Sequence, residues 1–335
     1  MDLDLDRLTP WLAATIGHGG VDVTRYPGGQ SNPTYLVDTA RGSYVLRRKP
    51  FGVLLPSAHA IEREYRLIAA LHPTGYPVPR PIALCEDAGV IGAPFYLMEQ
   101  VAGRTIWNGA MPNATPDERR AHYWAMVDAL SALHGIDPVA AGLGDYGKPG
   151  NYFERQVARW TRQYRASQTD DLPDVERLID WLPRTLPVQE RVTIVHGDYR
   201  IDNLIFADDG ARVAAVLDWE LSTLGDPMAD FTYLLMNWMT PADDRSGIAG
   251  LSGGDSGIPT IEEVVARYCA ATGRDGVPGL DWYFAYNLFR LTGIVQGIKQ
   301  RVRDGNASSA QAARMAERVP ELAAAAWRFA EKAGA

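Results

Sequence analysis

The sequence contains little cysteine and no long hydrophobic run. Its 335 residues include two cysteines, Cys85 and Cys269, which lie far apart in the chain. Neither a disulfide framework nor a cysteine-rich metal site is therefore expected, and a reducing compartment fits. No apolar segment approaches the ~20 residues that cross a bilayer, and the acidic residues 1–6 lack the basic start of a secretory signal. We expect a cytoplasmic protein without a membrane partner.

Basic residues are too few for a typical nucleic-acid-binding protein. The chain has 33 Lys and Arg against 41 Asp and Glu, a net charge of −8, whereas nucleic-acid-binding domains carry a basic surface. Apolar residues make up 46% of the chain and charged residues 22%, which excludes intrinsic disorder. We expect a globular protein of one large or two smaller domains that does not bind nucleic acid.

The chain divides into a strand-rich first part and a helical remainder. Alternating or apolar segments predict strands at 21–26, 34–37, 43–47, 82–85 and 95–98. Apolar spacing predicts a helix at about 58–72, and a capping box at Thr115 opens the first helix of the second part. A hairpin at 204–217 interrupts the later helices. The sequence therefore predicts a small strand-rich lobe, a hinge at about 99–103 and a large helical lobe.

The clearest chemical signal is the segment His-Gly-Asp-Tyr-Arg-Ile-Asp-Asn at 196–203. Asp198 is followed after four residues by Asn203 on a tight loop, which is the spacing of the kinase catalytic loop. In that loop the aspartate accepts the proton of the attacking hydroxyl and the asparagine holds magnesium. Asp218 ends the next hairpin, where it can bind the metal that bridges the nucleotide phosphates. These residues predict a phosphotransfer site.

With these motifs the chain resembles the aminoglycoside phosphotransferase and choline kinase superfamily. The resemblance rests on segments 28–35, 44–50, 196–203, 218–221 and 223–230. The first two are most similar to kinase-like domains found alone in bacteria or fused to acyl-CoA dehydrogenases. The resemblance implies an α+β, two-lobed protein-kinase-like fold, with an N-terminal antiparallel sheet lobe at 1–101 and a larger helical C-terminal lobe at 104–335. It also implies ATP and Mg²⁺ as cofactors.

The resemblance assigns a glycine turn and a hinge to nucleotide binding. At the turn, glycine lets the backbone approach phosphates, and consecutive N–H groups can hold oxyanions. An isolated Gly-Gly pair is more typical of an ordinary hairpin, so the assignment depends on the other motifs. Residues 98–103 resemble a kinase hinge, in which backbone groups of Glu99 and Val101 would contact the adenine edge. The turn and its flank contain Gly28, Gly29, Gln30, Ser31 and Asn32.

Charged side chains complete the predicted nucleotide site. Arg47 stands where the family has a phosphate-binding lysine, and an arginine there keeps the charge but is bulkier. Lys49 is the alternative if the strand continues, because side chains two residues apart share a face. Glu64 is the expected partner of Arg47, in competition with Glu62. Arg200 lies where protein kinases have a phosphate-contacting lysine, and a salt bridge within the loop is the alternative.

Two charged groups bear on the phosphate acceptor. Arg155, Arg159 and Arg162 recur at helical spacing, and such a basic stripe would hold an anionic substrate such as a coenzyme A thioester or would form a solvated face. The resemblance to dehydrogenase-fused domains favours a hydroxyacyl-CoA. A polycationic aminoglycoside would instead need an acidic rim, for which the sequence offers Asp170, Asp171, Asp174 and Glu176.

The sequence also bears on three rival functions. The glycine-rich segment 142–147 matches a dinucleotide fingerprint, but it has no preceding strand and no following helix, so a Rossmann site is rejected. No Ala-Pro-Glu element follows Asp218, which disfavours a protein kinase. A non-catalytic nucleotide-binding module stays a rival because Arg47 replaces the usual lysine.

The sequence as a whole predicts an ATP- and Mg²⁺-dependent kinase that phosphorylates a hydroxyl of a small molecule. Asp198 and Arg200 are its candidate catalytic residues, and Asn203 and Asp218 its candidate metal ligands. His196 is expected to pack as a structural residue. The acceptor, the preference for ATP over GTP and the oligomeric state stay open at this point.

Overall fold

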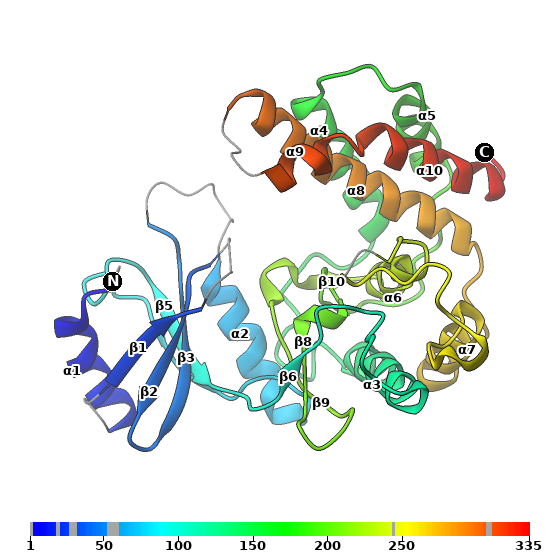
Figure 1. Ribbon diagram of the computed structural model, residues 1–335. Coiled ribbons are helices and arrows are strands. Elements are labelled where there is room, and N and C mark those ends of the chain that lie inside the picture. Colours follow the sequence, from blue (N-terminus) through cyan, green and yellow to red (C-terminus); the bar gives the residue numbers. More distant parts are fainter. Residues whose placement is uncertain (1–2, 18–20, 27–31, 52–59, 243–244, 306–309) are drawn as a thin grey trace.

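The computed structural model describes residues 3–17, 21–26, 32–51, 60–242, 245–305 and 310–335. An antiparallel sheet in the N-terminal part of the chain lies beside a larger group of helices (Figure 1). This arrangement confirms the predicted α+β architecture with a sheet lobe and a helical lobe.

The N-terminal lobe is built on a five-stranded antiparallel sheet of strand order β1-β2-β3-β5-β4. Side chains of β5 alternate between two cores: Phe95 and Leu97 pack with α1, while Tyr96 and Met98 pack in the core that contains α2. Helix α2 therefore lies between the sheet and the helical lobe (Figure 1). The elements are α1 Leu5–Ile16, β1 Val21–Arg25, β2 Thr34–Thr39, β3 Gly42–Arg48, α2 Ile61–Leu71, β4 Pro81–Cys85 and β5 Phe95–Glu99.

The C-terminal lobe consists of helices around two small antiparallel sheets, β6-β8-β9 and β7-β10. The strands are β6 Arg104–Thr105, β7 Thr193–Val195, β8 Leu204–Phe206, β9 Val213–Val216 and β10 Thr223–Gly225. The helices are α3 Pro116–Gly135, α4 Tyr152–Ser167, α5 Pro173–Trp181, α6 Met228–Leu235, α7 Ile261–Thr272, α8 Leu280–Arg303, α9 Ala310–Ala316 and α10 Val319–Lys332. Across the described ranges, no helix combines the length and apolar character needed to cross a membrane.

Local capping chemistry fixes several helix starts. Thr115 forms the predicted capping box with Glu118 at the start of α3. Asp226 accepts a hydrogen bond from the amide of Met228 at 2.9 Å and so caps the start of α6. Helix α1 was not predicted; it contains Pro10, and an internal proline argues against a helix in sequence patterns.

The chain passes from one lobe to the other at Gly103. This glycine has φ 142° and lies against β8, so that an added Cβ would stand 2.6 Å from Cγ2 of Ile205 and closer still to the carbonyl oxygen of Phe206. Both the dihedral angle and the close approach require glycine. The hinge backbone is therefore fixed against the C-terminal lobe.

We expect Gly103→Ala to lower the free energy of unfolding by about 1–3 kcal/mol, because the new Cβ must displace the backbone of β8. Urea unfolding measures this change. Gly210→Ala is the matched control: its Cβ meets nothing within 4 Å, and a change below ~0.5 kcal/mol is expected. Equal stability of the two variants would contradict the role of Gly103.

Candidate active site

Asp198 lies on the loop after β7, and its carboxylate is approached by three donors. Tyr233 donates its hydroxyl to Oδ1 at 3.0 Å, and Nε of Arg200 lies 3.3 Å from the same oxygen. Asn203 donates its side-chain amide to Oδ2 at 3.3 Å and to the carbonyl oxygen of Asp198 at 2.8 Å. The Asp198 side chain is nevertheless 22% exposed, so the carboxylate is held in place and open to solvent.

Buried groups hold the backbone of this loop. Asp230 accepts hydrogen bonds from the amides of His196 at 2.6 Å and Gly197 at 2.8 Å. Burial raises the pKa of Asp230, but hydrogen bonds from His134 and from the Gly197 amide outweigh burial, and the net pKa is lowered. Nε2 of His196 lies 2.8 Å from the carbonyl oxygen of Leu217. His196 therefore packs as a structural residue, as the sequence predicts, and Asp230 holds the loop backbone.

The two predicted metal ligands lie on neighbouring segments. Asn203 ends the 3-10 turn Ile201–Asn203, and Asp218 precedes the 3-10 turn Trp219–Leu221. The amide of Leu217 donates to the carbonyl oxygen of Asn203 at 2.8 Å, which joins the segments directly. Asp218 has φ 64° and ψ 63°, a left-handed conformation that is uncommon outside glycine and typical of functional sites.

The ligand types at this point fit magnesium. No cluster of three or more His, Cys, Asp and Glu side chains suited to a metal occurs among the described residues. Mg²⁺ seldom needs such a cluster, because it binds through one or two carboxylates together with substrate phosphates. The amide oxygen of Asn203 and the carboxylate of Asp218 are the hard oxygen ligands that this mode of binding requires.

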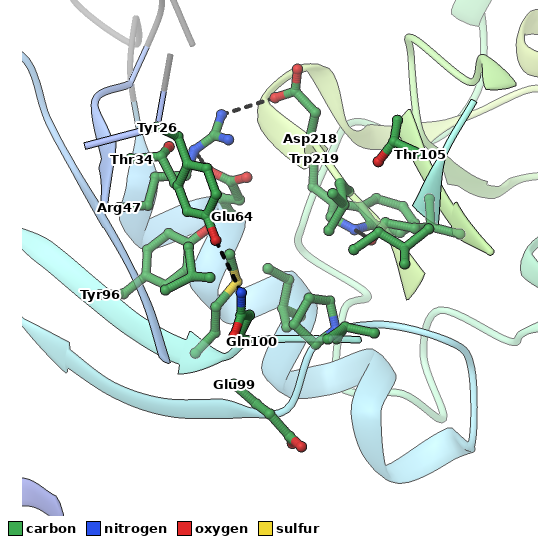
Figure 2. Close-up of a pocket in the computed structure, with 18 of the residues that line it drawn as sticks. Tyr26, Thr34, Arg47, Glu64, Tyr96, Glu99, Gln100, Thr105, Asp218 and Trp219 are labelled. Atoms are coloured by element: carbon green, nitrogen blue, oxygen red, sulfur yellow. Dashed lines mark hydrogen bonds and ion pairs between the residues drawn. The ribbon is translucent and has the colours of Figure 1, made fainter. Parts of the chain in front are cut away.

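Arg47 connects the two lobes through its guanidinium group. Its Nε lies 3.1 Å from Oε2 of Glu64 on α2, and its Nη2 donates to Oδ1 of Asp218 at 2.9 Å (Figure 2). Lys49, two residues further along, instead pairs with Glu62 at 2.5 Å. Arg47 thus has the predicted partner Glu64, and the competing residues Lys49 and Glu62 pair with each other.

Burial and mutual attraction shift the pKa values of Glu64 and Arg47. Burial raises the pKa of Glu64 to about 7, and the charge of Arg47 opposes that change. Burial also lowers the pKa of Arg47, but attraction to Glu64 and to its other neighbours outweighs burial and the net pKa is raised. Arg47 therefore carries its charge at any physiological pH.

A cavity of about 390 Å³ lies between the lobes (Figure 2). Arg47, Glu64 and Asp218 lie at the end of the cavity opposite to Glu99. Such a combination of an apolar wall and a few charged groups is typical of a small-molecule site. The apolar wall includes Val45, Ile68, Met98, Ile205 and Val216.

The hinge segment forms the other end of the cavity. Glu99 and Val101 both line it, but the Glu99 side chain points away and pairs with Arg80 at 3.1 Å (Figure 2). The amide of Val101 makes no backbone hydrogen bond to another described residue. Gln100 donates Nε2 to the hydroxyl of Tyr26 at 3.3 Å, a contact across the cavity that the sequence did not predict.

The predicted phosphate turn is described in part. Gly28, Gly29, Gln30 and Ser31 lie outside the described residues. Asn32 is 1% exposed, and its side-chain nitrogen and oxygen have no hydrogen-bond partner within the described part of the chain. Because buried polar groups are nearly always paired, this amide is suited to a polar ligand.

The predicted arginine stripe on α4 is divided between two roles. Arg155 donates to backbone carbonyls of the preceding loop, including that of Lys148 at 2.7 Å, and so stabilises the fold. Arg159 is exposed, with its guanidinium carbon 5.3 Å from the ring centroid of Trp160. Arg162 is exposed as well. Arg159 and Arg162 are thus the exposed members of the stripe, whereas Arg155 is half-buried.

Two residues that contact the loop of Asp198 were not predicted from the sequence. Tyr233 follows Asp230 by three residues, and that spacing places both on one face of a helix, a signal that was available. Arg290 of α8 donates Nη2 to the carbonyl oxygen of Gly197 at 2.7 Å. Arg290 lies far from Gly197 in the sequence, so no local pattern could have identified it.

The two lobes, the cleft and the loop geometry define a protein of the kinase-like phosphotransferase class. Residues 22–283 match the sequence model of the phosphotransferase enzyme family, and the chain belongs to this family. Acyl-CoA dehydrogenase family member 10 of Mus musculus is 45% identical over 332 residues, which cover 98% of this chain and 31% of that protein. Family member 11 of Homo sapiens is 39% identical over 303 residues, which cover 90% and 39%. The chain therefore spans less than half the length of these relatives.

Solved structures show the same fold. A protein of Ralstonia eutropha JMP134, described provisionally as an aminoglycoside phosphotransferase, has a TM-score of 0.90 and 46% identity, with 98% of this chain and 99% of that chain covered. Spectinomycin phosphotransferase in complex with ADP and spectinomycin has a TM-score of 0.63 and 15% identity, with 96% and 98% covered. These findings confirm the predicted resemblance and the protein-kinase-like fold.

Glu64→Gln tests the buried pair through the pH dependence of stability. The pKa of Glu64 is raised from 4.5 to about 7, so the unfolded chain releases this proton at a lower pH than the folded protein does. The resulting stabilisation is complete below pH 4.5 and is lost as the pH rises towards 7, by about 3 kcal/mol at most.

We therefore expect the unfolding free energy of the wild-type protein to fall between pH 4.5 and 7 relative to that of Glu64→Gln. Urea unfolding across this range measures the difference. Glu62→Gln, two residues earlier on the same helix, serves as the control and should keep the wild-type slope. Parallel slopes for the wild type and Glu64→Gln would contradict the assignment.

Proposed function

We propose that this chain is an ATP- and Mg²⁺-dependent phosphotransferase that transfers the γ-phosphate of ATP to a hydroxyl group of a small molecule. The observation that carries the proposal is that Asp198 and Asn203 are in contact on one loop, and that this loop is hydrogen-bonded to the segment that carries Asp218 into the cavity. Asp198 contacts Asn203 directly, and the Asn203 carbonyl is bonded to the residue before Asp218. General base and metal ligands are needed side by side in this reaction.

The proposed nucleotide site is the cavity between the lobes. Its apolar wall suits the adenine, and the amide of Val101, which makes no backbone hydrogen bond within the described part of the chain, offers a donor to the adenine edge. Arg47 at the opposite end would contact the phosphates. Crystallisation of spectinomycin phosphotransferase with ADP supports nucleotide use by this fold, and the buried free thiols of Cys85 and Cys269 fit the proposed cytoplasmic location.

We propose that Asn203 and Asp218 hold the magnesium ion, which would neutralise charge on the phosphates. Asp198 would orient the acceptor hydroxyl and accept its proton. Arg200 lies 3.3 Å from Asp198 and 3.2 Å from Asp202, which supports a role in holding the loop. A guanidinium has five N–H donors, so the same side chain can also contact the transferred phosphate.

An anionic acceptor is the better match to the exposed charges of α4 and of the segment that follows it. The acidic side chains that would bind an aminoglycoside are already engaged: Lys299 pairs with Asp170, and Arg165 pairs with Glu176. Arg177 also lies 3.4 Å from Asp174. Arg159 and Arg162 are exposed.

Together with the similarity to acyl-CoA dehydrogenase relatives, these charges favour a hydroxyacyl-CoA over an aminoglycoside, another amino alcohol or a sugar. The aminoglycoside names of the distant structural neighbours bear on the fold alone.

A non-catalytic nucleotide-binding module is the second candidate. The observation that favours it is the contact of Arg47 with Asp218, which occupies a proposed metal ligand. Arg47 nevertheless retains the charge and the Glu64 partner of a phosphate-binding residue. The two candidates differ in whether ADP is released in the presence of an acceptor.

We expect the wild-type protein to release ADP with a hydroxyacyl-CoA and to release little with aminoglycosides, choline or sugars, in a coupled assay. Asp198→Asn should lower kcat by ~10²–10⁴-fold with little loss of ATP binding, because the general base is removed. Asp209→Asn, in the exposed turn of the hairpin, is the control and should keep wild-type turnover. Unchanged turnover in Asp198→Asn would remove Asp198 from the mechanism, and binding without turnover on every compound would favour the non-catalytic module.

A further inference from the structure

We infer that Tyr233 and Arg290 are positioning residues that set the orientation of the Asp198 carboxylate. This inference rests on the proposed phosphotransferase function. Tyr233 lies on α6, three residues after Asp230, so the two side chains share a face of the helix. Asp230 holds the loop backbone through two amides, while Tyr233 donates its hydroxyl to Oδ1 of Asp198 at 3.0 Å. One helix therefore fixes both the backbone and the carboxylate of the catalytic loop.

Arg290 completes this arrangement from α8. Its Nη2 donates to the carbonyl oxygen of Gly197 at 2.7 Å, and its guanidinium carbon lies 4.8 Å from the ring centroid of Tyr233, within the range of a cation–π contact. Gly197 is thus held at its amide by Asp230 and at its carbonyl by Arg290. Both backbone polar groups of Gly197 are therefore hydrogen-bonded where the loop begins after β7.

The electrostatics keep Tyr233 as a donor. Burial and the charge of Asp198 raise the pKa of Tyr233 to about 12, although Arg290 and Arg200 oppose the increase. The hydroxyl is therefore protonated throughout the physiological range and donates to the carboxylate. A carboxylate that receives this hydrogen bond keeps its remaining lone pairs for the acceptor hydroxyl in a defined direction.

Tyr233→Phe tests this inference because it removes the hydroxyl and keeps the ring that faces Arg290. We expect kcat to fall by about 10–100-fold with an unchanged KM for ATP, since orientation of the base and not nucleotide binding is lost. Arg290→Lys should retain more turnover than Arg290→Met.

Tyr283→Phe is the matched control; this buried tyrosine of α8 packs on Phe153 and Trp282 and should leave kcat and the Asp198 carboxyl signal unchanged. A readout without turnover separates this inference from the proposed function. In protein labelled with ¹³C at the aspartate carboxyl, the Asp198 signal, assigned by its loss in Asp198→Asn, should change its chemical shift in Tyr233→Phe at one fixed pH, because the hydrogen bond from Tyr233 is lost.

If the wild-type protein phosphorylates no compound, the proposed function fails, and the carboxyl chemical shift alone decides whether Tyr233 acts on Asp198. An unchanged chemical shift together with an unchanged kcat in Tyr233→Phe would overturn the inference. A fall in thermal stability with kcat and the chemical shift intact would do the same, since Tyr233 would then serve the fold only.

Discussion

The buried charge of Arg47 constrains the whole site. Its side chain is 14% exposed, and a charge at that depth is costly unless opposite charges compensate it. Glu64 from α2 and Asp218 from the helical lobe supply this compensation. These ion pairs join the sheet, α2 and the loop after β9 in the present structure. The cavity between the lobes ends at these charges, and the residue before Asp218 is hydrogen-bonded to Asn203.

The two sides of the cleft are held by different means. Ion pairs between side chains align the sheet lobe, and such pairs can exchange partners when phosphate and metal arrive. The catalytic loop is instead bonded through its backbone to Asp230 and Arg290. Removal of such buried hydrogen bonds leaves unpaired polar groups. The chain thus combines an adaptable phosphate end with a fixed position for the proposed base.

Patterns within short segments allowed much of the fold to be predicted. The strands of the N-terminal sheet, the capping box at Thr115 and the loop from Asp198 to Asn203 depend on neighbouring residues, and each was identified. Helix α1 was missed because Pro10 interrupts its pattern. Arg290 was missed because its partner, Gly197, is brought to it by the packing of α8, which no local spacing encodes. The division of the arginine stripe on α4 likewise depends on the position of the preceding loop, which captures Arg155.

In the proposed function Arg47 contacts the phosphates and Asp218 binds magnesium, so the contact between Arg47 and Asp218 has to break when nucleotide and metal bind. A crystal structure of the chain with a non-hydrolysable ATP analogue and Mg²⁺ tests this most directly. We predict the adenine at the hinge, the metal on Asn203 and Asp218, and the Arg47 guanidinium on phosphate with Glu64 still beside it. A nucleotide bound outside the cleft, or Arg47 still bonded to Asp218 with no metal ion there, would contradict it.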